Sequence, residues 1–139
     1  MRPLLVITIL GLAGFAGCTS SSPAQASCSA DGIGAVQALD LHVGSNPDGS
    51  MYLTPSTVTV AHCAKAQFVV HNDDAIFHDV ALLNYAGDSF EHEAEPGQTV
   101  STHHAGIDYF VAKASGSFPI ICEVKGHAEK GMKGTFVVN

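Results

Sequence analysis

The chain has 139 residues, of which 46% are hydrophobic and 14% are charged, a composition and length typical of one packed globular domain. Thirteen acidic residues against six basic ones give a formal net charge of -7, which disfavours nucleic acid as a partner because phosphate binding relies on clustered lysine and arginine. No segment after residue 18 approaches the roughly 20 consecutive apolar residues that a membrane-spanning helix needs.

The N-terminal residues 1–17 predict a signal peptide, because a basic residue precedes a long apolar run. Two processing sites compete after it. The sequence FAGC resembles a bacterial lipobox, with Phe15 in place of the usual aliphatic residue, and predicts a lipid on Cys18; AQA predicts ordinary cleavage before Ser27. We favour the lipoprotein, because Cys18 directly ends the apolar run and a Ser- and Ala-rich linker follows over 18–33. Either product is exported, to the periplasm or to the outer face of the cell membrane.

Four cysteines in an exported chain suggest disulfide bonding. If Cys18 carries lipid and Cys122 binds a ligand, Cys28 and Cys63 remain. We therefore predict a disulfide between Cys28 and Cys63, and closing that loop would stabilise the fold by roughly 4 kcal/mol. Two free thiols are the alternative.

From residue 34 onward the chain predicts an all-β domain that extends to residue 139. Segments rich in Val, Ile, Thr and Phe alternate with clusters of Gly, Pro, Asn and Asp, and in STVTVAH the valines recur at every second residue. Regular spacing of such segments fits a Greek-key β-sandwich or barrel. The eight expected strands are 35–43, 56–62, 66–72, 77–84, 98–104, 107–114, 117–123 and 133–139.

One connection between the last two expected strands holds three metal-binding side chains, Cys122, His127 and Met132. Gly126 and Gly131 give this loop the backbone freedom to wrap around a single point. Thiolate and thioether together favour copper, since soft sulfur suits Cu(I), imidazole suits both oxidation states, and methionine is a poor zinc ligand. A blue-copper site needs one more imidazole.

His78 is our choice for the second imidazole among the eight histidines. It opens an expected strand directly after a turn, within NDDAIFHDVALL, where packed neighbours can hold it. His71 is the competitor, although it precedes the turn.

The segments VVHNDDAIFHDVAL and GSFPIICEVKGHAEKGMKGTFVV together resemble the cupredoxin (type 1 blue copper) family, and the C-x4-H-x4-M spacing resembles its rusticyanin and sulfocyanin branch. The resemblance covers about residues 34–139 and implies one type 1 copper ion. The ligands it implies are His78, Cys122, His127 and Met132. Two positions depart from the family pattern: Asp79 stands where many members have an Asn or Ser whose side chain braces the cysteine loop, and Ile120 stands where an aromatic is common.

The remaining histidines are expected to have ordinary roles. His92, in FEHEAE, is expected in an acidic, solvated loop. His103 and His104 are adjacent on an expected strand, so their side chains point to opposite faces and cannot easily chelate one metal. His42 and His62 are expected to be strand or strand-end residues. A second metal at His92, His103 or His104 stays open.

Four protein ligands leave no open position for a substrate, so we predict an electron carrier that cycles between Cu(II) and Cu(I), not an enzyme. A copper-delivery protein is the alternative, and a subunit or sensor domain with structural copper is a further one. The expected partners are redox proteins, an electron donor and an acceptor, with membrane association through the lipid anchor and a monomeric chain.

Partner docking is expected at the end of the domain that carries His127. The lysines that flank the copper loop could steer an acidic partner, or could serve only the solubility of the loop. These lysines are Lys125, Lys130 and Lys133, whereas an acidic stretch elsewhere contains Asp88, Glu91, Glu93 and Glu95.

Overall fold

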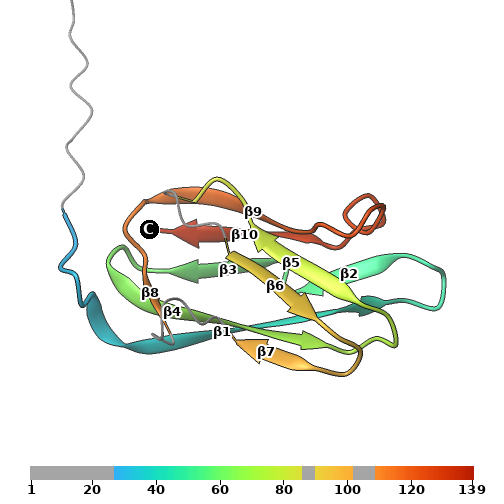
Figure 1. Ribbon diagram of the computed structural model, residues 1–139. Coiled ribbons are helices and arrows are strands. Elements are labelled where there is room, and N and C mark those ends of the chain that lie inside the picture. The colour runs from blue at the N-terminus through green and yellow to red at the C-terminus, as the bar shows by residue number, and fades with distance from the viewer. Residues whose placement is uncertain (1–26, 86–89, 102–108) are drawn as a thin grey trace, which may run out of the picture.

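Two β-sheets packed face to face form the domain (Figure 1). The computed structural model describes residues 27–85, 90–101 and 109–139. Over these ranges the chain forms strands and turns, and no helix long and apolar enough to cross a membrane occurs in them. The all-β prediction is confirmed, in its sandwich form, because the described strands make two separate sheets and do not close into a barrel.

The first sheet is built around the long first strand. Its order is β2-β1-β4-β7, and β8 also pairs with β4. β1 and β4 run parallel, whereas β2, β7 and β8 are antiparallel to their neighbours. The strands are β1 (Ile33–Ser45), β2 (Met51–Thr54), β4 (Ala64–Asn72), β7 (Thr99–Ser101) and β8 (Phe110–Val111).

The second sheet carries both strands that flank the predicted copper loop. Its order is β3-β10-β9-β5-β6, in which β3 and β10 pair in parallel and the other pairs are antiparallel. The strands are β3 (Thr57–Val60), β5 (His78–Leu82), β6 (Phe90–Ala94), β9 (Gly116–Cys122) and β10 (Lys133–Val138). The loop from β9 to β10 lies at one end of the sandwich, and the C-terminus lies at the other (Figure 1).

The core fills the space between the sheets because each strand turns every second side chain inward. In β4 buried and half-buried residues alternate without a break. Phe136 is fully buried and lies against four other rings, with centroid distances of 5.4 to 6.4 Å. These rings belong to Phe68, Tyr85, Phe110 and Phe118. Ile120 is also buried, so an aliphatic side chain fills the position where the family often has an aromatic.

Two strands were not expected from the sequence, and both are short or at a sheet edge. β2 has four residues, too few for a clear pattern, although Met51 and Leu53 point inward. β6 is an edge strand rich in charge, so the prediction that His92 lies in a solvated loop is wrong. His92 pairs with Val80 of β5, and its half-buried side chain lines a small internal cavity.

The expected strands in the region from 98 to 114 are only partly seen. β7 covers Thr99–Ser101 and β8 covers Phe110–Val111, so the described parts are shorter than predicted. His103 and His104 lie outside the described residues, as do the signal peptide, Cys18 and Asp88.

Candidate metal centre

Three segments distant in sequence meet at one end of the second sheet and bring the predicted ligands together. β9 ends at Cys122 and β5 begins at His78. Antiparallel pairing places Val80 opposite Cys122, so His78 lies just beyond the cysteine at the same end. The backbone N–H of Glu123 donates to the carbonyl of Asp79 at 2.8 Å, which continues the pairing past the last strand residue.

Three donor atoms converge on one point. The Nδ1 atoms of His78 and His127 are 3.2 Å apart, and Cys122 Sγ is 3.5 Å from His127 Nδ1. All three atoms lie within 4.8 Å of one another. His78 and Cys122 are 0% and 2% exposed, whereas His127 is 9% exposed and is the ligand closest to solvent.

Met132 is fully buried in the same loop, and the backbone ties it to two of the other ligands. Its N–H donates to the His127 carbonyl, and its own carbonyl accepts from the Cys122 N–H, each at 3.1 Å. The loop therefore closes on itself, with the methionine next to the last residue of β9.

Burial sets the protonation of the two imidazoles. It lowers the pKa of His78 against the opposing effect of Asp74, and it lowers the pKa of His127, with Lys130 acting in the same direction. Both rings are therefore neutral near pH 7, which is the form that binds a metal. His78 Nε2 lies 3.4 Å from Asp74 Oδ2 but makes no hydrogen bond among the described residues, whereas its Nδ1 lies beside His127 Nδ1.

The thiolate form of Cys122 would place a negative charge in a buried position. Burial raises its pKa, while backbone N–H groups of Asp79 and Val124 donate hydrogen bonds to the sulfur and lower it. Two such donors stabilise a thiolate, and a bound cation would compensate its buried charge. Two neutral nitrogens, one thiolate and a buried thioether are a donor set that fits copper.

Asp79 braces the cysteine through its backbone rather than through its side chain. Its N–H donates to the Cys122 sulfur and its carbonyl accepts from Glu123. The carboxylate oxygen Oδ1 is buried without a hydrogen-bond partner among the described residues. Burial, followed by Glu91 and Glu123, raises the pKa of this carboxyl.

His71, the competitor of His78, lies on the outer face of the first sheet. Its Nε2 is 3.0 Å from Asp40 Oδ1 and its Nδ1 is 3.1 Å from Thr99 Oγ1. Its ring stacks on His42 at a centroid distance of 4.5 Å. The alternation of side chains along β4 places His71 on the outer face, because Val70 and Asn72 point inward and the residue between them must point outward.

Asn72 is a residue of the site that the sequence reasoning missed. It is 3% exposed, and its amide nitrogen lies 2.9 Å from the carbonyl of Ile76, 2.8 Å from that of Ala94 and 3.1 Å from that of Glu95. Its Oδ1 accepts from the Asp74 N–H at 2.9 Å. One side chain thus closes the turn that leads to His78 and attaches it to the end of β6. An Asn directly before Asp-Asp was the available signal.

Replacing Asn72 with alanine is expected to lower the free energy of unfolding by about 1–3 kcal/mol, because buried carbonyls lose their donor. Metal affinity should fall with it, since the turn before His78 loses its support. Urea denaturation and copper titration measure the two effects. Asn46→Ala is the matched control: this asparagine is exposed in a turn, and a change within about 0.5 kcal/mol is expected. Equal stabilities of the two variants would contradict the role of Asn72.

The predicted disulfide is confirmed, since Cys28 and Cys63 are joined; the alternative of two free thiols is set aside. Cys122 is the free cysteine among the described residues, and it is buried.

Comparison with protein-family models and with curated proteins finds no match. Among solved structures, reduced auracyanin from Roseiflexus castenholzii is similar, with a TM-score of 0.58, 16% identity, and coverage of 76% of this chain and 99% of that one. Auracyanin A, a "blue" copper protein from Chloroflexus aurantiacus, has a TM-score of 0.54 and 21% identity over 74% of this chain and 100% of that one.

A copper-containing nitrite reductase from Thermus scotoductus is also similar, with a TM-score of 0.61 and 18% identity. The match covers 76% of this chain and 28% of the reductase, so the same fold occurs inside a larger enzyme. At these levels of sequence identity, the similarity establishes a shared fold.

Proposed function

The chain has the cupredoxin fold, and from this fold and its buried donor set we propose that it binds one type 1 copper ion and carries single electrons. The observation that carries the proposal is the convergence of His78 Nδ1, Cys122 Sγ and His127 Nδ1 within 4.8 Å. When bound, copper supplies the one-electron change between Cu(II) and Cu(I).

Each side chain has a distinct part in holding such an ion. Cys122 offers the thiolate, the two imidazoles offer neutral nitrogen donors, and Met132 offers the weak thioether ligand. The ends of β5 and β9 and the closed loop hold these groups, so the protein can keep one geometry through a change of oxidation state. A fixed geometry is what fast electron exchange requires.

A carrier fits the site better than an enzyme or a delivery protein. Four side chains complete the coordination of a type 1 ion and leave no position for a substrate. Copper delivery requires the ion to leave easily, whereas three of the four proposed ligands are almost fully buried. The visible spectrum of the Cu(II)-loaded protein and a redox titration test the proposal. An intense band with reversible one-electron reduction is expected; a colourless protein that yields Cu(I) to a chelator would overturn it.

We place the carrier outside the cytoplasmic membrane, anchored through a lipid on Cys18, because this cysteine directly ends the apolar run. Intact mass and detergent partitioning of the protein expressed with its native N-terminus measure the anchor. A lipid-modified mature chain beginning at Cys18 is expected. A soluble chain that begins at Ser27 would show that the ordinary cleavage site is used.

The docking face for redox partners is proposed at the end where His127, the most exposed of the four ligands, approaches solvent. Lys125, Lys130 and Lys133 are exposed around it. If they steer an acidic partner, charge reversal in Lys125→Glu with Lys130→Glu should slow bimolecular electron transfer at low salt and leave the spectrum unchanged. Rising salt should remove the difference, since screening acts over about 8 Å at physiological ionic strength.

The matched control reverses two lysines at the opposite end, Lys65 and Lys113, and gives the same net charge. Stopped-flow rates with the redox partner across a salt series compare the two double variants. Equal slowing of both would mean that only net charge matters, and that the lysines of the loop do not direct docking.

A further inference from the structure

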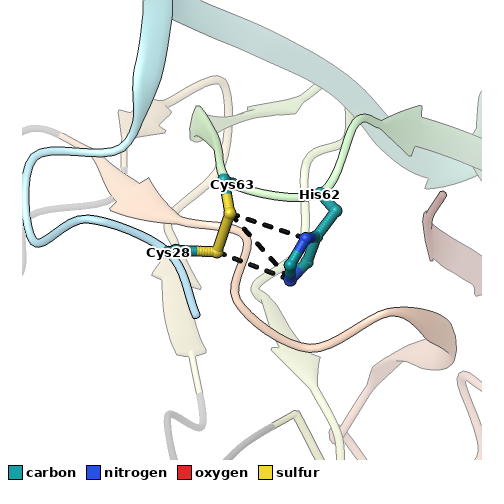
Figure 2. A group of neighbouring side chains, drawn as sticks. All are labelled: Cys28, His62 and Cys63. Carbon is teal, nitrogen blue, oxygen red and sulfur yellow. Dashed lines mark hydrogen bonds between the residues drawn. A yellow bond between two sulfur atoms is a disulfide. The ribbon is translucent and has the colours of Figure 1, made fainter. Parts of the chain in front are cut away.

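A second cluster of potential ligands lies at the end of the sandwich opposite the copper loop. The Cys28–Cys63 disulfide joins the N-terminal segment to the turn between β3 and β4, and the ring of His62 lies against both sulfur atoms (Figure 2). His62 Nε2 is 3.4 Å from Cys28 Sγ, and Nδ1 is 3.5 Å from Cys63 Sγ. One atom from each residue lies within 4.8 Å of the others.

One hydrogen bond fixes the tautomer of His62. Its Nε2 is 2.9 Å from the carbonyl oxygen of Lys113, and because a carbonyl only accepts hydrogen bonds, Nε2 carries the proton. The lone pair is then on Nδ1, which lies 3.5 Å from Cys63 Sγ, whereas Nε2 lies 4.0 Å from the same sulfur. Histidines that bind metals commonly donate their other N–H to a backbone carbonyl, which fixes the tautomer and the ring. A disulfide sulfur carries no proton to donate, so it gives this lone pair no hydrogen bond.

Backbone hydrogen bonds hold His62 and Cys63 in place independently of the S–S bond. The Ile33 N–H donates to the Cys63 carbonyl at 2.8 Å, and the Cys63 N–H donates to the Ala112 carbonyl at 2.8 Å. The His62 N–H donates to the Asn139 carbonyl at 2.7 Å. Cys63 also has a φ of 67°, a left-handed conformation that is uncommon for a residue with a side chain and recurs at binding sites. Cleavage of the disulfide would thus leave Cys63 beside His62, and the bond from Ile33 keeps the segment that carries Cys28 attached five residues away.

We propose that reduction of this disulfide creates a second metal site, in which Cys28 Sγ, Cys63 Sγ and His62 Nδ1 bind one thiophilic ion, Zn(II) or Cu(I). A dithiol reductant supplies two electrons and two protons: the S–S bond breaks, two Cys thiols form, and the reductant becomes a disulfide. Metal binding then displaces the two thiol protons to solvent. Two thiolates and an imidazole suit these ions and leave one position for water or an external ligand.

The site is separate from the copper centre and goes beyond the proposed function, because it uses none of the four copper ligands. All three residues are half-buried, so a small reductant and a metal ion can reach them. The oxidation state of the disulfide decides whether the site exists, which makes metal binding at this end conditional on a reducing environment.

Co(II) is the probe for the test, because its thiolate complexes have strong near-ultraviolet and visible bands. The full chain, loaded with copper, is reduced anaerobically with a phosphine, desalted and titrated with Co(II). One equivalent is expected to bind with thiolate bands after reduction and none before it. The Cys122→Ser variant should give the same result, so the test stands even if the copper proposal fails.

Two further variants locate the bound cobalt. Cys28→Ser with Cys63→Ser should abolish the bands. His62→Ala should weaken Co(II) binding by more than the about 10- to 100-fold that loss of an outer partner of a ligand costs. Bands that persist in the double serine variant, or a reduced wild type without thiolate bands, would overturn the proposal. So would loss of the β-sheet circular dichroism on reduction, because the site requires the fold to persist.

Discussion

Replacing Cys122 with serine is expected to abolish the intense visible absorption of the copper-loaded protein and to lower its copper affinity by orders of magnitude. The thiolate supplies both the charge-transfer colour and the strongest bond of such a site. A serine hydroxyl stays protonated and is a hard, weak ligand. The variant should keep its fold, because serine is similar in size and its oxygen can accept the N–H groups of Asp79 and Val124 that now point at the sulfur.

The measurement is the visible spectrum with a competitive copper titration. Ser117→Ala, at the exposed other end of the same strand, is the control, and its spectrum should match that of the wild type. A Cys122→Ser protein that remains blue would show that the copper proposal rests on the wrong thiol.

Replacing Gly131 with alanine is expected to cause the largest loss of stability of any change in the loop. Gly131 has a φ of +116°, and a Cβ there would lie 2.6 Å from the backbone oxygen of Met51. The strained conformation alone costs about 1–3 kcal/mol. The clash adds to this cost, because backbone on β2 cannot move aside as a flexible side chain would. Met132 is the next residue, so we expect copper affinity to fall together with the free energy of unfolding.

The Gly126→Ala variant separates the cost of the backbone conformation from the cost of the clash. Gly126 also has a positive φ, +87°, but a Cβ at this position would meet no atom of the described residues within 4 Å. Its cost should therefore be that of the backbone conformation alone, about 1–2 kcal/mol. Denaturant unfolding of both metal-free variants measures the difference. Equal losses of stability would mean that the contact between the loop and β2 does not constrain the loop.

Local patterns in the sequence determined the β class, the disulfide and the loop that gathers Cys122, His127 and Met132. These features depend on neighbours a few residues apart: alternation with period two marks a half-buried strand, and glycines between closely spaced ligands mark a loop that can close. The pairing of Cys28 with Cys63 was predicted by elimination, because Cys18 was assigned to lipid attachment and Cys122 to metal binding. The copper ligands themselves stay a prediction until the ion is bound and measured.

The sequence favoured His78 over His71, but only the tertiary structure showed what brings His78 to the cysteine and what supports it there. The register that places Val80 opposite Cys122 brings in His78, and the parity of β4 turns His71 to the outside. The sequence patterns also did not predict the edge strand β6 or the hydrogen bonds of Asn72, because the partners of both lie in other parts of the chain. At the opposite end, the fold brings Cys28 to His62 across 34 residues. Strand register and edge pairing arise from contacts between distant segments, and the order of neighbouring residues does not encode them locally.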